Sequence, residues 1–312
     1  MRRRDRPFLT GILNHCYQRT VDGGLLFYCY SDYLVWFTII CTVAKKHSVL
    51  ILAMCPMPDH VHLTVVAYSR KDLASFMAEY TRLFSAVHNK VCHRRGQLFQ
   101  RPFGSAVKKG AKAARTNLVY VGNNPVERQL ALKAEDYRWT FLAYYGSGHP
   151  YSERLIVRNS RWPLRKAVGE VKEEHKSNRP LKYAQLQRMF QPLDKKESLQ
   201  LTDFIISTYN VIDYPAAIRF FGGFQDMLTA MHANTGSEYD LNEPFVGKSD
   251  EYYAQMANIV MNRLRPADIH DILAFSDEEK RNVFKLLRKQ TKASPEQIAK
   301  FLRLREMETA DR

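Results

Sequence analysis

Disulfide and zinc-ribbon patterns are missing from this 312-residue sequence. Its cysteines are odd in number and contain no Cys-x-x-Cys pair; they are Cys16, Cys29, Cys41, Cys55 and Cys92. Without such spacing a disulfide framework or a zinc ribbon is not expected, and a reducing cytosol suits the chain better. Internal repeats and low-complexity tracts are also missing, so a repeat architecture is not expected.

Long apolar runs are missing as well. The most apolar stretch, Tyr33–Ala44, is too short to cross a bilayer and ends at two lysines. The basic start MRRRDRPF does not lead into a signal peptide, because Thr10, Gly11 and Asn14 interrupt the apolar run that would follow. We therefore expect a cytoplasmic protein without a membrane partner.

Acidic residues are scarce in the first two thirds of the chain. Residues 1–200 hold 33 Lys and Arg against 15 Asp and Glu, whereas residues 201–312 hold 14 against 17. The net charge of +15 therefore lies entirely in the first part. Positive charge gathered in this way attracts polyanions and favours a nucleic-acid partner, although a generally basic soluble protein has the same composition.

The periodicity of apolar residues predicts an α+β fold with helices packed against an antiparallel sheet. We expect Ser31 to cap the first helix, and Ser69 with Asp72 to form a capping box on the second. With 25–30 counted as part of the first strand, the order is strand, helix, two strands, helix, strand, helix. The later elements are expected at 31–47, 49–55 (ended by Pro56), 60–67, 69–93, 103–108 and 111–124.

Composition divides the chain into three parts. Residues 1–150 carry the α+β pattern, and 151–197 are polar and basic, which indicates a linker or an arm along a phosphate backbone. Residues 198–312 are near-neutral and predicted to be helical. Two short helices between 278 and 305, the second opened by Ser294, Pro295 and Gln297, fit either a helix-turn-helix that binds DNA or an ordinary helical hairpin.

His60 and His62 lie in the segment HVHLTVVA, whose alternation predicts a strand. Both rings then point to the same side of the sheet, where they can reach one divalent ion. Such pairs are more often surface or hydrogen-bonded histidines, and an ion needs further ligands. The pair by itself leaves both interpretations open.

Tyr120 and Asn124 are four residues apart in NLVYVGNNPVER, so a helix presents both on one face. Asn124 offers a neutral oxygen ligand, and Tyr120 offers a phenol that can attack a phosphodiester beside a metal ion. Most of the 17 tyrosines must nevertheless be core or surface residues. Because Pro125 disfavours helical geometry before it, we expect Asn124 at the end of the helix.

Taken together, these segments resemble the REP-associated branch of the single-tyrosine, His-hydrophobe-His (HUH) transposases, within the IS200-like superfamily. The likeness covers about the first 145 residues. It rests on HCYQR (15–19), SDYLVWF (31–37), MPDHVHLTV (57–65), Asn89 with GQLFQRPF (96–103), YVGNNPVER (120–128) and EDYRW (135–139).

The resemblance implies a ferredoxin-like HUH domain with both histidines on a central strand. It also implies that His60, His62 and Asn124 bind Mg²⁺ or Mn²⁺ and that Tyr120 is the nucleophile. The expected substrate is single-stranded DNA that forms REP-like hairpins, cut and rejoined through a 5′-phosphotyrosine by a monomer or homodimer at the bacterial nucleoid. The candidate phosphate contacts in the basic cleft are Arg101, Lys108, Lys109, Lys112 and Arg115.

Two positions depart from the family pattern. Glu127-Arg128-Gln129 follow the Asn-Pro-Val segment where Arg-Ala-Gly is usual, which puts local phosphate contacts in doubt. Asp59 stands where asparagine is common; it either positions a ligand histidine through a hydrogen bond or caps the turn.

Other functions fit parts of the same sequence. A catalytically silent DNA-binding protein could retain the hairpin recognition, and a transcription regulator could depend on the C-terminal helix pair. A replication initiator or relaxase would share the nuclease chemistry. The Asn-Pro-Val and LFQ segments favour the transposase.

Overall fold

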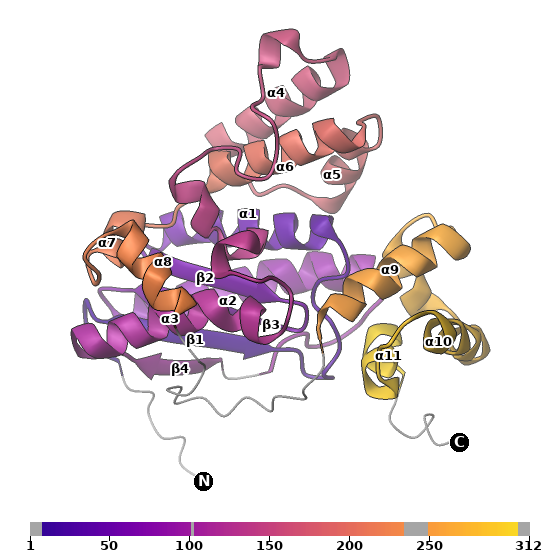
Figure 1. The fold of residues 1–312 in the computed structure, drawn as a ribbon, viewed down its shortest axis with the longest axis horizontal. Coiled ribbons are helices and arrows are strands. Elements are labelled where there is room, and N and C mark those ends of the chain that lie inside the picture. Colours follow the sequence, from indigo (N-terminus) through magenta and orange to yellow (C-terminus); the bar gives the residue numbers. More distant parts are fainter. Residues whose placement is uncertain (1–7, 101–102, 234–248, 305–312) are drawn as a thin grey trace.

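A computed structural model describes residues 8–100, 103–233 and 249–304. At its centre lies an antiparallel sheet with the strand order β2-β3-β1-β4 (Figure 1). The strands are β1 (Leu13–Arg19), β2 (Leu50–Met57), β3 (His60–Val66) and β4 (Gly104–Val107). Helix α1 (Tyr30–Lys46) connects β1 to β2, and α2 (Arg70–Val91) connects β3 to β4. This βαββαβ order is ferredoxin-like, so the predicted α+β fold with a helical extension is confirmed.

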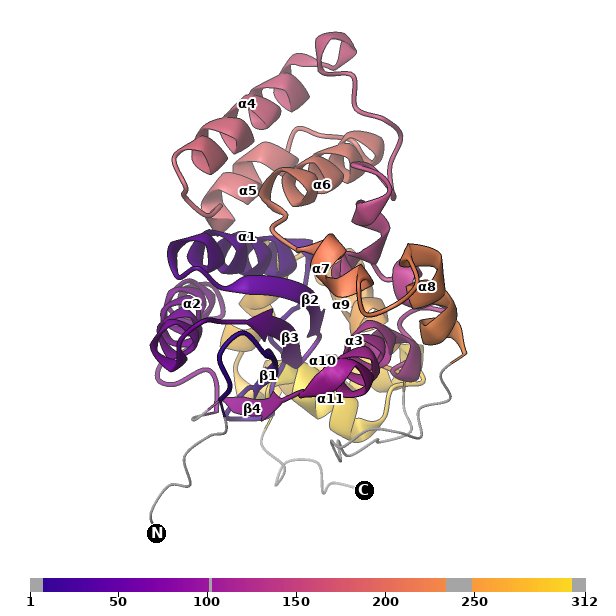
Figure 2. The same cartoon turned by 90° about the vertical axis from the view of Figure 1, so that its left-hand side faces the viewer.

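Strand β3 divides its side chains between the two faces of the sheet, as its alternation predicts. Val61, Leu63 and Val65 belong to the main core with α1 and α2. On the other face, Val66 packs with Leu118 of α3 (Gly110–Glu127). The turned view shows the sheet between α1 and α2 on one side and α3 on the other (Figure 2). The histidine face of β3 is therefore the face that α3 covers.

Two expectations about the start of the domain are wrong. The first strand is β1 (Leu13–Arg19), whereas residues 25–29 form a loop whose apolar side chains are buried. Helix α1 is capped not by Ser31 but by Asp32, whose Oδ2 accepts hydrogen bonds from the backbone N–H groups of Tyr28 (2.7 Å) and Cys29 (3.0 Å). A buried loop and a buried strand both consist of consecutive apolar residues, so the sequence pattern does not distinguish them.

Both prolines that were expected to end an element lie inside one. Pro56 belongs to β2, which lies at the edge of the sheet beside β3, so the missing N–H falls where it is tolerated. Pro125 lies inside α3, which continues to Glu127, so Asn124 is not at the helix end. The Arg128 N–H still bonds to the Asn124 carbonyl (3.1 Å), and the proline removes only its own donor. By contrast, the predicted Ser69–Asp72 cap of α2 is confirmed.

Residues 151–197, expected as a linker or arm, contribute helices to the main core. After the short 3₁₀ turns η1 (Ala134–Asp136), η2 (Arg138–Thr140), η3 (Leu142–Tyr145) and η4 (Val157–Asn159) come α4 (Trp162–Lys176), α5 (Tyr183–Phe190) and α6 (Lys195–Tyr209). Leu164, Val168 and Val171 of α4 are buried. Basic residues dominate the composition of this segment because they occupy the exposed sides of these helices. Their number concealed the apolar residues that recur on the buried side of each helix. Helices α7 (Tyr214–Ile218) and α8 (Phe224–His232) follow beside α3.

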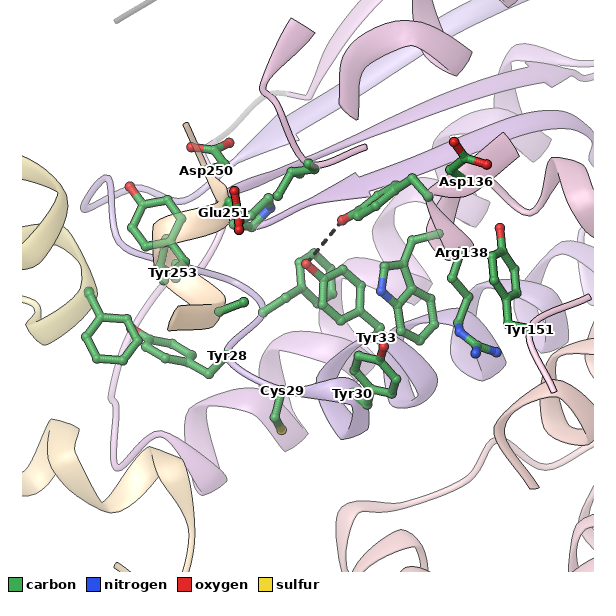
Figure 3. A pocket seen from close by; sticks show the side chains of 18 residues that line it. Tyr28, Cys29, Tyr30, Tyr33, Asp136, Arg138, Tyr151, Asp250, Glu251 and Tyr253 are labelled. Atoms are coloured by element: carbon green, nitrogen blue, oxygen red, sulfur yellow. Dashed lines mark hydrogen bonds between the residues drawn. The ribbon is translucent and has the colours of Figure 1, made fainter. Parts of the chain in front are cut away.

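The last part of the described chain, residues 249–304, forms a separate helical module with its own apolar core. It comprises α9 (Glu251–Arg263), the 3₁₀ turn η5 (Ile269–Ala274), α10 (Asp277–Gln290) and α11 (Pro295–Leu302). The predicted helix pair and the Ser294–Gln297 capping box are confirmed as structure. Leu25 and Tyr28 from the loop before α1 enter the core of this module, and a cavity opens between α1, residues 130–139 and α9 (Figure 3).

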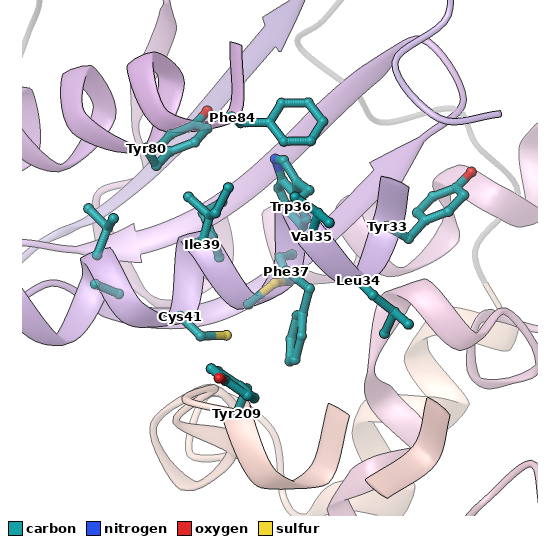
Figure 4. Close-up of a cluster of buried hydrophobic side chains, with 14 of the residues drawn as sticks. Tyr33, Leu34, Val35, Trp36, Phe37, Ile39, Cys41, Tyr80, Phe84 and Tyr209 are labelled. Atoms are coloured by element: carbon teal, nitrogen blue, oxygen red, sulfur yellow. The ribbon is translucent and has the colours of Figure 1, made fainter. Parts of the chain in front are cut away.

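The main core is built around α1, whose side chains are buried on nearly all sides (Figure 4). Trp36 and Ile39 face α2, where Tyr80 and Phe84 lie, while Cys41 approaches Tyr209 of α6. A helix that is apolar all round must be enclosed, and α2, the sheet and α4–α6 enclose this one. No helix among the described residues is long and apolar enough to cross a membrane.

Asp32, at the start of α1, connects three parts of the chain. Besides capping the helix, it accepts a hydrogen bond from the Tyr183 hydroxyl of α5 (2.6 Å) and pairs with His270 Nε2 of η5 (3.0 Å). Burial opposes both charges, but the Asp32 and Asp268 carboxylates raise the pKa of His270 to about 10, and His270 lowers the pKa of Asp32 to about 2. The pair is therefore charged throughout the neutral range.

This pair generates a stability prediction. Replacing His270 with Ala leaves the Asp32 charge buried with fewer partners, so we expect a loss of about 3–5 kcal/mol in the free energy of unfolding. His232→Ala, which breaks the exposed pair with Glu135, should cost less than about 1 kcal/mol. Urea unfolding followed by circular dichroism measures both, and equal losses would contradict the assignment. Because the raised pKa of His270 exceeds its unfolded value near 6.5, its contribution is full below that pH and disappears as the pH rises through about 10.

Candidate active site

Strand β3 places His60 and His62 on the face that α3 covers. Their ring centroids are 4.8 Å apart and their planes are perpendicular. Both side chains are almost fully buried, at 1% and 0% exposure. The structure therefore brings the two histidines together as the alternation of the strand predicts, in an enclosed position rather than on the surface.

Helix α3 brings Tyr120 against this pair. The Tyr120 ring stands edge-on to His62, with centroids 5.4 Å apart, and edge-on to His15 of β1 at 5.6 Å. One turn earlier, Asn117 accepts a hydrogen bond from the Thr64 hydroxyl of β3 (2.9 Å), which fixes the helix to the strand. Residues of one strand and one helix thus set the position of the phenol relative to the imidazoles.

Asn124 lies one turn beyond Tyr120 and is buried. Its side-chain nitrogen donates to the Tyr120 carbonyl (2.9 Å). This bond orients the amide and does not use Oδ1, the atom that would ligate an ion. The expected spacing of Tyr120 and Asn124 on one helix is therefore present, and the helix that carries them runs on past Pro125.

His15 is a fourth ring in this cluster. Its Nε2 lies 3.0 Å from His62 Nδ1, and the two rings are stacked with centroids 5.1 Å apart. Burial, helped by the charge of Lys108, lowers the pKa of His15 to about 3, and burial also holds the pKa of His62 well below its usual value. Both rings are therefore neutral at physiological pH. When His62 Nδ1 donates to His15, His62 Nε2 carries a lone pair that a cation can use.

Asp59 bonds to His60 on the opposite side of the cluster. Asp59 Oδ1 lies 2.5 Å from His60 Nδ1, and its Oδ2 forms an ion pair with Lys300 of α11. Burial raises the pKa of Asp59, but His60 and Lys300 outweigh it and hold that pKa well below the usual range. Of the two roles expected for Asp59, the hydrogen bond to the histidine is the one that the structure contains.

The candidate phosphate contacts surround the start of α3. Lys109 occupies the position before the first turn of the helix, and Lys112 and Arg115 are exposed on its first turns. Lys108 is half-buried at the end of β4, where its N–H bonds to the Leu13 carbonyl. Arg101 lies outside the described residues. A helix N-terminus with exposed lysines suits a phosphate group, since the macrodipole and the side chains have the same sign there.

A second group with metal-ligand chemistry lies at the start of α1. Atoms of Cys29, Asp32 and His270 lie within 4.8 Å of one another. The Asp32 oxygens already accept hydrogen bonds from two backbone N–H groups, the Tyr183 hydroxyl and His270. We assign this group the connecting role described above, because protein donors already satisfy its carboxylate.

His15 and Lys300 were not predicted from the sequence. His15 stood within the HCYQR segment of the resemblance, so its position on a strand beside β3 was a usable signal. Lys300 offered none, since 240 residues separate it from His60. Only the packing of α11 against the β2–β3 turn brings it to Asp59.

Comparison with known proteins supports the resemblance inferred from the sequence. The family model described as "Transposase IS200 like" matches residues 33–124, a range that contains His60, His62, Tyr120 and Asn124. One solved structure, described as a REP-associated tyrosine transposase bound to a REP hairpin, is 18% identical, with a TM-score of 0.39. That match covers 45% of this chain and 81% of the other. None of the curated proteins matches the chain.

The buried environment of His15 generates a prediction for NMR. Because the pKa of His15 is lowered to about 3, its ring carbon-bound protons should not shift between pH 8 and pH 5. The His15→Gln spectrum identifies the resonance. A midpoint near 6.5, the value of an exposed histidine, would show that the ring is hydrated instead. Since the unfolded chain binds this proton more readily, the buried ring lowers stability as the pH falls from about 6.5 to about 3.

Proposed function

We propose that this chain, whose residues 33–124 match the IS200-like transposases, cuts and rejoins single-stranded DNA through a covalent link to Tyr120. One observation carries the proposal: the Tyr120 ring packs directly against His62, on the same sheet face as His60. A phenol beside two imidazoles that can ligate a cation is a suitable arrangement for nucleophilic attack on a phosphodiester. The family match covers the same residues and supports this assignment.

The reaction would exchange one phosphodiester for another. The Tyr120 oxygen attacks phosphorus in line, a tyrosine–phosphate bond forms, and the bond to the 3′-oxygen breaks. The phenol loses its proton, and the departing 3′-oxygen gains one. Attack by a 3′-hydroxyl on the 5′-phosphotyrosine reverses the step, so no nucleotide cofactor is needed.

His60, His62 and Asn124 would hold Mg²⁺ or Mn²⁺. The donor set fits such an ion, because burial keeps His62 neutral and the Asn124 bond to Tyr120 leaves Oδ1 available as a hard oxygen ligand. A bound divalent ion polarises the scissile phosphate and offsets the charge that develops on it. Asp59 and His15 would orient the imidazoles of His60 and His62 through hydrogen bonds to their Nδ1 atoms.

The substrate that we propose is a single strand containing a REP-like hairpin, as the sequence resemblance implies. Lys109, Lys112 and Arg115 would bind its phosphates at the start of α3, and Lys108 lies at the adjoining end of β4. These contacts carry no sequence information, so base recognition must come from other parts of the chain. The protein would act as a monomer or a homodimer.

The nucleophile can be tested by a matched pair of substitutions. We expect Tyr120→Phe to abolish the covalent protein–DNA band that forms when end-labelled, hairpin-containing single strands are incubated with Mn²⁺ and run on a denaturing gel. Tyr17→Phe, the same change at a tyrosine 5.9 Å from His15 on the neighbouring strand, should retain it. A protease-sensitive band that persists in Tyr120→Phe would show that Tyr120 is not the nucleophile. As a control, chelation of the metal should remove the band from the wild type.

The role of Asp59 can be measured without any activity assay. Asp59→Asn weakens the hydrogen bond that orients His60, so we expect Mn²⁺ affinity to fall about 10- to 100-fold in calorimetric titration. Asp277→Asn makes the same change on the exposed first turn of α10 and should leave the affinity unaltered. Equal affinities for wild type and Asp59→Asn would show that the carboxylate only stabilises the turn.

The alternative is a catalytically silent DNA-binding protein. It is favoured by the burial of the cluster, in which Tyr120 is 5% and His60 1% exposed. A strand can reach these groups only when a covering element moves. Tight DNA binding without a covalent band on any hairpin substrate would support this function instead of the nuclease.

A further inference from the structure

A cavity of about 370 Å³ lies beside the candidate active site, between α1, residues 130–139 and α9 (Figure 3). Its volume is in the range of sites that hold small organic groups. One wall belongs to the C-terminal module, outside the range that the family model matches, and consists of Asp250, Glu251, Tyr253, Ala254 and Phe301. The cavity is therefore a feature of how this chain combines its two cores.

Aromatic residues make up half of the lining. Trp139 stacks on Tyr33 with centroids 4.4 Å apart, and Tyr30 stands edge-on to Trp139 at 5.4 Å. Tyr151 and Tyr253 lie on opposite sides of the cavity. Tyr30 is half exposed, and the Arg138 guanidinium lies over its ring at 5.9 Å from the centroid. Flat apolar walls of this kind suit a planar ring, since bases stack on aromatic side chains irrespective of their sequence.

The charged groups of the lining are hydrogen-bond acceptors and not phosphate ligands. Asp136, Asp250 and Glu251 contribute carboxylates. The one cation among the lining residues is Arg138, which pairs with Asp203 and donates to the Tyr144 hydroxyl (2.9 Å). A phosphate would meet net negative charge here, whereas a ring with amino groups would find acceptors.

Asp250 is the most informative of these groups. The residue is 7% exposed, and it lines the cavity next to Glu251. Burial and the nearby Asp59 raise the pKa of Asp250 to about 6, which leaves it ionised at neutral pH. An ionised carboxylate on the wall of a cavity is a strong hydrogen-bond acceptor, so a ligand that donates hydrogen bonds to it gains affinity.

The cavity is also close to the reacting groups. Pro58, which lines it, precedes His60 by two residues, and the Asp250 N–H bonds to the carbonyl of Arg128 at the end of α3 (3.1 Å). Both the histidine strand and the tyrosine helix thus contribute to its surroundings.

We propose that this cavity binds one unpaired nucleobase that carries an amino group, adenine, guanine or cytosine, with the ring among the aromatic side chains and the amino group on Asp250. Thymine has a carbonyl in place of the amino group and offers the carboxylate only its ring N3–H, which is flanked by two carbonyl oxygens that the carboxylate repels. That this base belongs to the DNA strand that is being cut rests on the proposed function. The C-terminal module would then contribute base selection to chemistry carried by the first domain.

Free nucleosides test the cavity directly in metal-free buffer. Saturation-transfer NMR titrations with the full chain should show deoxyadenosine, deoxyguanosine and deoxycytidine binding at least about tenfold tighter than thymidine. We expect Tyr30→Ala to weaken all of them about tenfold, because it removes the exposed stacking ring. Asp250→Asn keeps the backbone bond to Arg128 and should abolish the preference over thymidine. Tyr68→Ala, at an exposed tyrosine outside the cavity, and Asp277→Asn are the matched controls and should bind as wild type.

Equal binding of all four nucleosides would overturn the proposal, as would no binding or unchanged binding in Tyr30→Ala and Asp250→Asn. Tetramethylammonium is titrated in parallel, and binding of this cation without any nucleoside would show that the cavity is a cation site. These titrations need neither Tyr120 nor a metal. A covalent band with Tyr120 but no nucleoside binding therefore removes only the base site, and nucleoside selectivity without a covalent band removes only the nuclease.

Discussion

The carboxylate of Asp32 is the interaction on which the arrangement of the molecule depends. Its oxygens receive donors from the loop before α1, from α5 and from η5, three segments far apart in the chain. A buried charge must be satisfied in this way, and satisfying it holds α5 and the C-terminal module to the same end of α1. That docking brings Phe301 and residues 250–254 to the cavity and brings Lys300 to Asp59.

The candidate site combines polar chemistry with a nearly dry environment. His15, His60, His62, Tyr120 and Asn124 are all buried, and burial keeps His15 and His62 neutral. Neutral imidazoles are what a divalent cation requires, so enclosure would prepare these rings for the ion that we propose. For the proposed function, the same enclosure means that a DNA strand would have to displace a covering element. The Lys300–Asp59 ion pair lies at this boundary, where the C-terminal module contacts a residue bonded to His60.

The parts of the fold that were predicted correctly are those with a strict local period. Alternation in β3 placed His60 and His62 on one face, and the Ser69–Asp72 pattern placed the start of α2. The errors arose where burial and local pattern disagree. Leu25 and Tyr28 lie in an apolar segment because they are buried in the core of the C-terminal module, and that apolar segment was taken for a strand. In α4 and α5 the basic residues lie on the exposed sides, and their number concealed the apolar residues that pack into the main core.

The sequence by itself determined the α+β order, the resemblance to IS200-like transposases and the pairs His60–His62 and Tyr120–Asn124, because these depend on residue types at short spacings. Only the tertiary structure decided that Tyr120 packs on His62, that His15 and Asp59 hold the imidazoles, and that an aromatic cavity opens between the two cores. Such contacts join residues up to about 240 positions apart, as Lys300 and Asp59 do. Their formation depends on how whole helices pack, which no local period encodes.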